Sequence, residues 1–438
     1  MSINSPHAFT IYNCKAPIGQ LPVELLADIF HIGLQEYGLD DLRAIKYLGA
    51  ITSTCSAWRY AALDTPSLWR RIIYKESAVP KSKGREIPPH TKDRLLAYLS
   101  RSEGCNILLH LHFCSTRRAQ AIKKTVYPHL PRCFAISLSS NAASNLDSFL
   151  PLPGNLCRLT EFTCIVHFAN SNSHPPIFVE PERVTLRKLA LDGTRPSLSR
   201  ISTQDLEDVR LTRLHNTWPE GATFVCRCHS LTTLIISDDI PFDTDRPSAP
   251  FTLPNLIHLE ISGFAILRAS HTPNLQTLII SLGFGDNFSG AVIPLPSWSA
   301  LTTLILTYRD MDTVEIISLM VLNPGIKRLI LLGCVGIDYI VQLLKGDGMG
   351  GAANTHGTTL LPSLSLLRVW GSAALGMGVF QSLFAHRPTL RIEHDEPLGG
   401  QIHADVEMTV EELDQNVEPG VFRLRRESPE GTAVSVNA

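Results

Sequence analysis

The feature that most constrains the fold of this chain is an apolar pattern that recurs between residues 108 and 369. In each copy, one apolar residue is followed by others three and five positions later. The steps between neighbouring copies are mostly 25 to 27 residues, with short steps of 19 and 20 and one long step of 38. A period of ~20–29 residues is typical of architectures built from stacked repeats. The eleven copies begin at Leu108, Cys133, Leu159, Leu186, Leu206, Leu231, Leu256, Leu275, Leu301, Ile326 and Leu364.

The last two apolar positions of each copy are separated by one residue, which is the alternation of a strand with one buried face. Strands from successive copies can stack in parallel and share a continuous core, as in a leucine-rich-repeat solenoid. We expect helical returns over residues 313–322, 337–344 and 378–385, and an irregular, Pro-rich return over 238–252. The pattern therefore predicts an α/β solenoid with a parallel sheet over residues 91–394. The alternative is an ordinary α/β domain whose strands share one pattern.

A shorter stretch, residues 20–74, has a helical pattern instead. Pro22 is favourable in the first turn of a helix because its missing N–H would have no partner there, and apolar residues recur at helical spacing as far as residue 35. Asp40 and Asp41 are suitable caps for a second helix, and a third is expected from residue 52 or 53 to Leu63. So short a stretch makes only a marginal core alone. It is either a helical cap for the following domain or a module completed by a partner.

Three linked motifs run through this stretch, namely Leu-Pro-x-Glu-Leu-Leu-x-x-Ile-Phe, Cys-x-x-Trp-Arg and Ala-x-x-x-Pro-x-Leu-Trp. In this order they resemble an F-box, although the turn over residues 31–41 is longer and more polar than many family members carry. Together with the repeats behind it, the chain resembles fungal-type F-box proteins with an irregular leucine-rich-repeat-like domain. The matching residues are Leu21, Pro22, Glu24, Leu25, Leu26, Ile29, Phe30, Cys55, Trp58, Arg59, Ala62, Pro66, Leu68 and Trp69.

The resemblance implies that this three-helix stretch binds the Skp-type adaptor of a cullin–RING (SCF) ubiquitin ligase. Large apolar side chains at the centre of such an interface normally carry most of the binding energy. Trp58 could equally belong to the core of the helices. The residues that the resemblance implies for adaptor binding, as surface or as support, are Leu21, Pro22, Leu25, Ile29, Phe30, Leu48, Cys55, Trp58, Leu68 and Trp69.

Composition narrows the class of protein. The chain has 438 residues, of which 44% are hydrophobic and 18% charged, which fits a large buried core and two or more structural units. A formal net charge of −2 gives no electrostatic reason to expect nucleic acid or a membrane surface as a partner. The ten cysteines are scattered without pairing, which is typical of a reducing compartment and indicates a cytoplasmic or nuclear protein. Neither a signal peptide nor an apolar run of membrane-spanning length is visible.

Changes in composition along the chain give the expected organisation. Residues 75–90 mix Lys, Ser, Gly and Pro, as a linker does. Apolar content falls from about residue 396 onward, as in a disordered segment. The expected parts are a loose leader (1–19), the F-box (20–74), a linker (75–90), the repeat array (91–394, opening with a helix at 91–101 and carrying an insertion at 346–358) and a disordered tail (395–438).

The chain offers no convincing motif for catalysis or metal binding. Cys226-Arg-Cys228-His229 lacks the second ligand pair that structural zinc requires. His110 and His112 lie on the same side of a predicted strand, but no third ligand is indicated. The Gly-rich stretches 283–290 and 346–351 lack the Lys-Ser/Thr ending of a phosphate loop. Without the partner groups that an active site requires, we expect no enzymatic activity, no metal and no cofactor.

If the repeats stack, the side chains between core positions line one face of the sheet. Four of them are isoleucines, whose exposed stripe would imply a bound partner or a covering tail. The alternative is a sheet covered on both faces, as parallel sheets commonly are. The candidate target-binding residues are Lys188, Asp208, Arg210, Ile235, His258, Glu260, Ile279, Ile305, Arg328, Arg368 and Trp370, with Asp192 and Ile330 on the same face.

These features predict a substrate-recognition subunit of an SCF ubiquitin ligase. The F-box would bind the Skp-type adaptor, and the repeats would hold an unknown protein substrate near the ubiquitin-charged enzyme, which raises its effective concentration there. One alternative is a non-catalytic binding scaffold that is not coupled to ubiquitination, and turnover of the bound protein would separate the two. Another alternative is an enzyme whose site the sequence does not reveal.

Overall fold

The computed structural model describes most of the chain between residues 21 and 394. The predictions for residues 1–19, most of 75–90, 346–358 and 395–438 lie outside the described residues. The chain divides into two units, Met1–Asp395 and Glu396–Ala438, and every described residue belongs to the first. The described ranges are 21–37, 41–76, 89–150, 152, 156–167, 176–177, 185–196, 201–213, 218–237, 251–262, 267, 270–281, 296–307, 313–334, 337–345, 360–370 and 377–394.

The described chain begins with three helices. Pro22 directly precedes the first of them, and the carboxylate of Asp41 caps the second by accepting from the backbone N–H of Arg43 at 2.8 Å. The third helix was expected to begin at residue 52 or 53 but begins at Ser56. Cys55, directly before it, is extended (φ −155°, ψ 171°) and separates it from the second helix. The elements are α2 (Val23–Gln35), α3 (Leu42–Thr54), α4 (Ser56–Leu63) and the 3-10 turn η2 (Pro66–Trp69).

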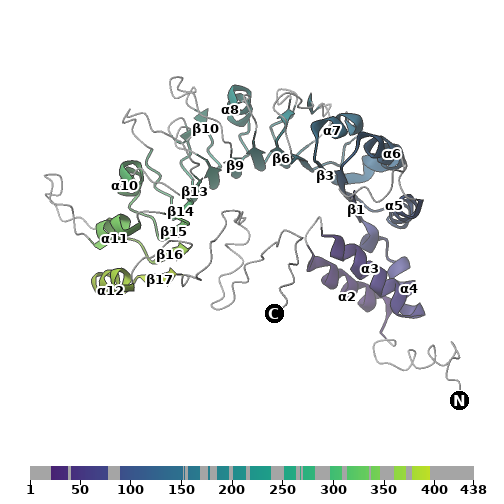
Figure 1. The fold of residues 1–438 in the computed structure, drawn as a ribbon, viewed down its shortest axis with the longest axis horizontal. Coiled ribbons are helices and arrows are strands. Elements are labelled where there is room, and N and C mark those ends of the chain that lie inside the picture. The colour runs from purple at the N-terminus through teal and green to yellow at the C-terminus, as the bar shows by residue number, and fades with distance from the viewer. Residues whose placement is uncertain are drawn as a thin grey trace, which may run out of the picture. The chain divides into compact units, whose positions relative to one another are not determined.

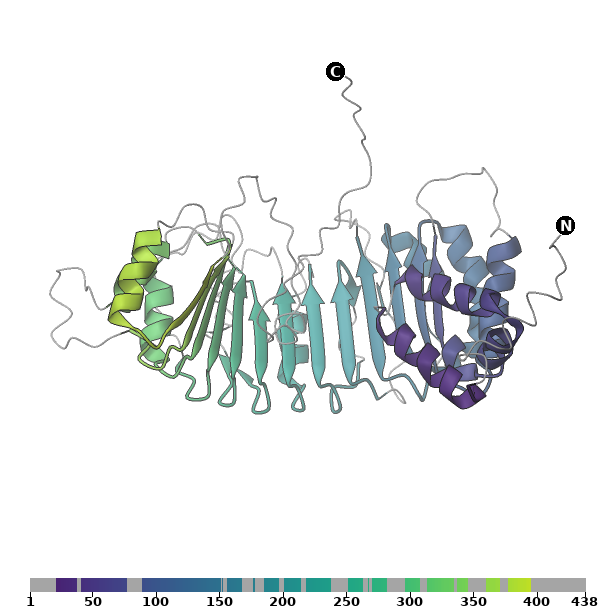
Figure 2. The same cartoon turned by 90° about the horizontal axis from the view of Figure 1, so that it is seen from below.

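A single open sheet of 13 strands, all parallel, follows the helices (Figures 1 and 2). Neighbouring strands of this sheet are consecutive along the chain once four two-residue strands are set aside, which is what stacked repeats require. Its strands are β1 (Arg71–Lys75), β2 (Ile107–Phe113), β3 (Cys133–Ser140), β4 (Glu161–Val166), β6 (Lys188–Asp192), β8 (Asp208–Thr212), β9 (Thr233–Ser237), β11 (His258–Ile261), β13 (Thr277–Ser281), β14 (Thr303–Thr307), β15 (Arg328–Leu332), β16 (Leu366–Trp370) and β17 (Arg391–His394).

Helices of the return segments lie along one side of this sheet (Figure 1). The three helical returns predicted near the end of the chain are confirmed within one residue at most boundaries. Two small sheets pair short strands, β5 (Pro176–Ile177) with β7 (Arg195–Pro196) and β10 (Phe251–Thr252) with β12 (Ser270–His271). The helices are α5 (Pro89–Arg101), α6 (Thr116–Val126), η3 (Tyr127–Arg132), α7 (Ala143–Phe149), α8 (Trp218–Cys226), α10 (Thr313–Leu322), α11 (Ile337–Lys345) and α12 (Met377–His386).

Backbone pairing brings the repeated apolar positions into register. Leu234, Leu259 and Leu278 are direct partners across β9, β11 and β13, and each is at most 1% exposed. The first copy of the pattern was read two residues too late. In β2, Leu109 pairs with Ile136, while Leu108 lies on the opposite side of the strand. Backbone pairing therefore decided that register, because a displacement of two residues keeps the same face of the strand inward and leaves the alternation unchanged.

The helical stretch and the sheet share one continuous core, which runs from Leu26 in α2 to Leu390 before β17. Trp69 joins them: its indole N–H donates to the carbonyl of Ala62 at 2.7 Å, and its ring packs edge-on to Tyr98 of α5 with centroids 5.0 Å apart. The guanidinium of Arg101 lies 4.4 Å from the centre of the same ring. Because β1 directly follows η2 and is the first strand of the sheet, no flexible linker separates the two parts at this point.

Replacing Gly193 by alanine should destabilise the protein more than replacing Gly104. Both have positive φ, +61° and +79°, where an L-residue costs about 1–2 kcal/mol. A Cβ at Gly193 would also lie 2.4 Å from the carbonyl oxygen of Val166, whereas nothing lies within 4 Å of a Cβ at Gly104. We expect urea denaturation to show a loss of about 2–4 kcal/mol for Gly193→Ala and about 1–2 kcal/mol for Gly104→Ala. Equal losses would contradict this close approach.

Candidate functional site: a helical surface and an open sheet face

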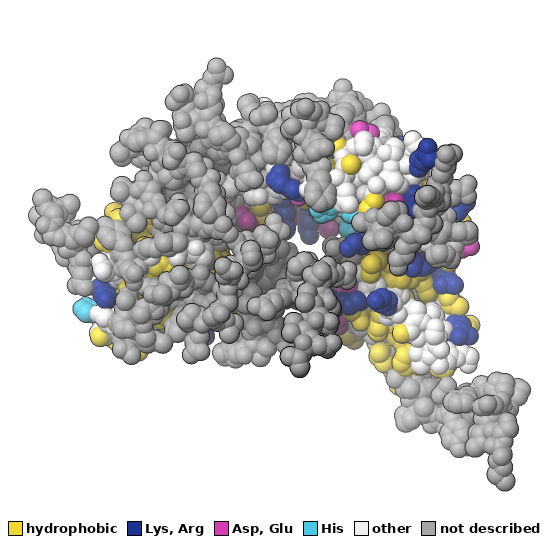
Figure 3. Space-filling model, viewed as in Figure 1, with side chains coloured by type: hydrophobic (Ala, Val, Ile, Leu, Met, Phe, Trp, Pro, Cys, Tyr) yellow, Lys and Arg dark blue, Asp and Glu magenta, His cyan; other side chains and the backbone are white. Residues whose placement is uncertain are grey.

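An apolar strip lies exposed along α2. Leu25, Ile29 and Ile32 are 49%, 41% and 61% exposed, and their spacing of four and three residues places them on one side of the helix. An adjoining side carries Leu26 and Phe30, which are buried in the core. Figure 3 shows hydrophobic side chains, in yellow, over the helices at the start of the described chain. A side of a helix that stays apolar and exposed is typical of a docking surface.

The third helix adds to the exposed apolar surface. Tyr60 is 67% exposed and Leu63 39% exposed. Between the helices, the half-buried ring of Trp58 meets the buried ring of Phe30 at 60°, with centroids 5.2 Å apart. Trp58 thus contacts the core while part of it reaches solvent, which is compatible with either interpretation of this residue. Such aromatic pairs add about 0.5–1.5 kcal/mol beyond the burial of their area.

The residues predicted to bind the adaptor fall into three groups by exposure. Those on the surface can contact a partner directly, and those in the core can only hold the surface in shape. Ile32, Tyr60 and Leu63 belong to the exposed surface but were missing from the prediction, since the motif does not include them. Pro22, Leu25 and Ile29 are exposed; Leu21, Cys55 and Trp58 are half-buried; Phe30, Leu48, Leu68 and Trp69 are buried.

The candidate target-binding residues all lie on one face of the 13-stranded sheet, away from the continuous core. Backbone pairing places them in rows that cross the strands. We call this surface the open face. Its central row is Arg210, Ile235, Glu260, Ile279, Ile305, Ile330, Arg368 and Glu393, and its flanking row includes Lys188, Asp208, His258 and Arg328, while Trp370 lies on the other flank.

The predicted isoleucine stripe is shorter than expected. Glu260 separates Ile235 from the other three members of the row. Ile279, Ile305 and Ile330 are adjacent and only 5%, 3% and 4% exposed, although they lie outside the continuous core. Strands β13, β14 and β15 are therefore buried on both faces, as parallel strands commonly are. The half-exposed positions of the open face lie on β8, β9 and β11 before these strands and on β16 after them.

Ion pairs cover the middle of the open face. Lys188 pairs with Glu161 at 3.5 Å, and Arg210 with Asp208 at 3.4 Å. Figure 3 shows Lys/Arg and Asp/Glu side chains beside histidines on the side of the sheet away from its helices. Because the charges balance locally, this region suits a polar protein surface better than a strongly charged ligand.

A bidentate pair lies at the ends of β4, β6 and β8. The guanidinium of Arg213 donates to both carboxylate oxygens of Asp192, at 2.6 and 2.5 Å, and also to the backbone carbonyl of Val166 at 3.3 Å. Arg213 has an unusual backbone, with φ of 51°. This geometry aims its side chain back over the ends of β4 and β6. Two-point pairs of this kind add geometric specificity as well as energy.

Histidines line the first strands of the open face. The rings of His110 and His112 each form a hydrogen bond with a serine on the next strand. His110 Nδ1 lies 3.0 Å from the hydroxyl of Ser137, and His112 Nδ1 lies 2.9 Å from that of Ser139. The ring of His112 also lies 5.9 Å from that of His167. Burial, followed by the charges of His167, Lys75 and His110, lowers the pKa of His112 to about 4. The imidazole of His112 is therefore neutral near pH 7.

Several cysteines are buried within the core. Burial raises the pKa values of the Cys133, Cys164 and Cys228 thiols to about 12, which keeps them protonated and unreactive. Cys228, of the motif considered for zinc, donates to the carbonyl of Phe224 at 3.4 Å. Within the part of the chain that the structure describes, His, Cys, Asp and Glu side chains form no group of three or more suited to a metal ion. The helices of the described ranges include none with the length and apolar character needed to cross a membrane.

Comparison with known families identifies the first part of the chain. Residues 18–75 match the F-box-like family. A search of curated proteins found no match to the chain. The chain thus contains an F-box-like domain, made of α2, α3, α4, η2 and β1, joined to a parallel-sheet region. F-box domains generally bind Skp-type adaptors, usually in SCF complexes, which supports an F-box adaptor role for this protein.

The neutral state of His112 predicts a pH-dependent stability. Because the pKa is about 4 in the folded state and 6.5 without burial, the unfolded state takes up the proton first as pH falls. Stability contributed by the neutral ring is present above pH 6.5 and lost as pH falls toward 4. Between pH 7 and pH 5, we expect the urea concentration at the unfolding midpoint to fall less for His112→Asn than for the wild type. A wild-type slope in His112→Asn would contradict the assignment.

Proposed function

We propose that this protein is the substrate-recognition subunit of an SCF-type ubiquitin ligase. In this proposal, the exposed strip of Leu25, Ile29 and Ile32 binds a Skp-type adaptor. The parallel-sheet region is a leucine-rich-repeat-like solenoid whose open face binds a protein target. The observation that carries the proposal is that the F-box-like match coincides with an apolar helix surface that remains exposed in the folded protein.

The continuous core supports a role in positioning. The F-box-like domain and the sheet are joined through Trp69, Tyr98 and Arg101, so a target bound to the open face would be held in a defined place relative to the adaptor. Function would then arise from proximity, because a tethered target reaches the ubiquitin-charged enzyme at a high effective concentration. The protein would need no catalytic residue, metal or cofactor of its own.

The target surface proposed here is the accessible part of the open face. Ile235 is a half-buried apolar side chain between Glu260 and Arg210, and Arg210 pairs with Asp208. An apolar centre within a polar rim is the usual anatomy of a protein interface. The alternative is a scaffold that binds the same partners without promoting their degradation.

An acidic residue in the α2 strip should abolish adaptor binding. Ile29→Asp places a charge in an interface that must exclude water, and we expect co-purification with a Skp-type adaptor to fall at least about tenfold, since a buried unpaired charge costs several kcal/mol. Phe384→Asp is the matched control, because Phe384 is 53% exposed on α12. If Ile29→Asp, folded by circular dichroism, retains the adaptor, the proposed docking surface is wrong.

A charge on the open face should instead release the target. Partners captured from cells by the wild type are to be compared with those of Ile235→Asp and of the control Val321→Asp, whose side chain is 60% exposed on α10. We expect Ile235→Asp to lose these partners while keeping the adaptor. Their half-lives should lengthen when Ile29→Asp replaces the wild type. Unchanged half-lives would favour the scaffold.

A further inference from the structure

Three basic side chains gather at the first strands of the open face. Lys75 of β1 pairs directly with His112 of β2, so the two side chains lie on the same side of the sheet. His167 follows β4, and the centre of its ring lies 5.9 Å from that of His112. We call Lys75, His112 and His167 the basic corner. Figure 3 shows histidines, in cyan, beside Lys and Arg side chains on this face.

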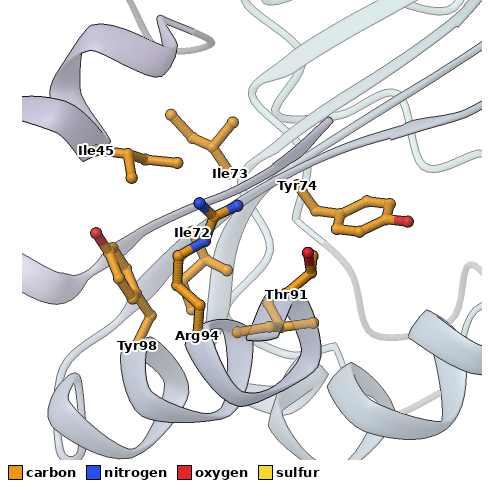
Figure 4. A pocket seen from close by; sticks show the side chains of 8 residues that line it. Ile45, Ile72, Ile73, Tyr74, Thr91, Arg94 and Tyr98 are labelled. Carbon is orange, nitrogen blue, oxygen red and sulfur yellow. The ribbon is translucent and has the colours of Figure 1, made fainter. Parts of the chain in front are cut away.

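The basic corner lies beside the F-box-like domain. Ile73 precedes Lys75 by two residues and therefore lies on the same side of β1. Ile73 and Ile45 of α3 line the same small pocket between α3, β1 and α5 (Figure 4). Lys75 is also the last residue of the F-box-like match. A group bound at this corner is therefore held close to the domain proposed to bind the adaptor.

Two members of the basic corner have no polar partner in the part of the chain that the structure describes. The exposed ammonium group of Lys75 makes no ion pair or hydrogen bond there. The ring nitrogens of the half-buried His167 make no hydrogen bond there either. Both groups can therefore bind an external acceptor without losing an interaction inside the protein.

The carboxylates around the basic corner are already engaged. Asp192 accepts two hydrogen bonds from the guanidinium of Arg213. The buried carboxylate of Glu76 lies 3.0 Å from the guanidinium of Arg118. These two pairs are neutral overall, so Lys75 leaves one positive charge without a counterpart among the described residues. A surface charge of this kind favours a partner of opposite charge.

The charge of the basic corner suits a carboxylate better than a phosphate. Burial lowers the pKa of His112 to about 4 and also lowers the pKa of His167, so both rings are neutral near pH 7. A neutral imidazole can donate one N–H hydrogen bond but adds no charge. One ammonium group matches the single charge of a carboxylate, whereas a phosphate group carries about −1.5 to −2. Arg118 and Arg213, which could supply more charge, already bind carboxylates.

The basic corner is also within reach of the target surface proposed above. The sheet order β1-β2-β3-β4-β6-β8-β9 places six steps between β1 and the strand of Ile235. At ~4.8 Å per step this is about 29 Å, which an extended segment of about nine residues spans. One segment of a target can therefore contact both.

We propose that the basic corner binds an Asp or Glu side chain of the protein target. The ammonium group of Lys75 pairs with the carboxylate, and a ring N–H of His167 donates a hydrogen bond to it. This inference rests on the proposed function, because it assumes that the open face holds the target. It deepens that function by naming an acidic residue as a feature of the bound segment.

The test selects phage-displayed random peptides of about twelve residues, long enough to span the surface, on full-length protein. Lys75→Glu reverses the charge of the basic corner. Lys124→Glu is the matched control, because Lys124 is an exposed lysine of α6 rather than of the sheet. We expect the wild type and Lys124→Glu to enrich peptides that contain Asp or Glu, and Lys75→Glu to enrich Lys or Arg at that position instead.

A synthetic copy of one selected peptide then gives magnitudes by calorimetric titration. Replacing its acidic residue by glutamine should weaken binding about five- to tenfold in the wild type and less than about twofold in Lys75→Glu. His167→Phe keeps a ring but removes the N–H donor, and should weaken the acidic peptide about two- to fivefold. A phosphoserine version that binds at least about tenfold more tightly than the acidic one would overturn the choice of carboxylate.

Binding of a purified Skp-type adaptor is measured in parallel and separates this inference from the proposed function. If the wild type binds the adaptor but enriches no acidic peptides, the inference is overturned and the proposed function stands. The same holds if Lys75→Glu and His167→Phe, both folded by circular dichroism, bind the acidic peptide as tightly as the wild type does. If the wild type does not bind the adaptor, both fall.

Discussion

The structure depends on the sharing of one buried row of side chains between parallel strands. Each strand of the main sheet has only four to eight residues and offers two or three inward side chains, so no single repeat can bury its apolar surface alone. Stacking in register places Leu234, Leu259 and Leu278 against one another and extends the core through all thirteen strands. The same constraint requires the first strand to be covered, and the F-box-like helices meet that requirement through Trp69.

This arrangement couples the two candidate surfaces. The α2 strip and the open face have no residue in common, yet both are held by a core that runs without interruption from Leu26 to Leu390. Trp69 was predicted to serve adaptor binding as surface or as support, and its burial between Ala62 and Tyr98 favours support. A side chain in that position can affect adaptor binding only by holding the helices in shape.

The sequence predicted much of the candidate site but not the exposure of its members. Leu25 and Phe30 belong to the same motif, yet one is exposed and the other buried, because the motif records both contact and supporting residues. Ile32 extends the strip by one turn, and its helical spacing from Leu25 and Ile29 was a signal that could have identified it. By contrast, the interruption of the isoleucine row by Glu260 appears only when the strands are paired.

What the sequence by itself determined is local. Pro22 and Asp41 mark helix starts, and the alternation within each repeat sets one buried face per strand, because these choices depend on neighbouring residues. The tertiary structure decided which strand residues pair, why Leu109 rather than Leu111 aligns with Ile136, and how α3, β1 and α5 enclose a pocket. These outcomes depend on packing between residues far apart in the chain, and no local pattern contains that information.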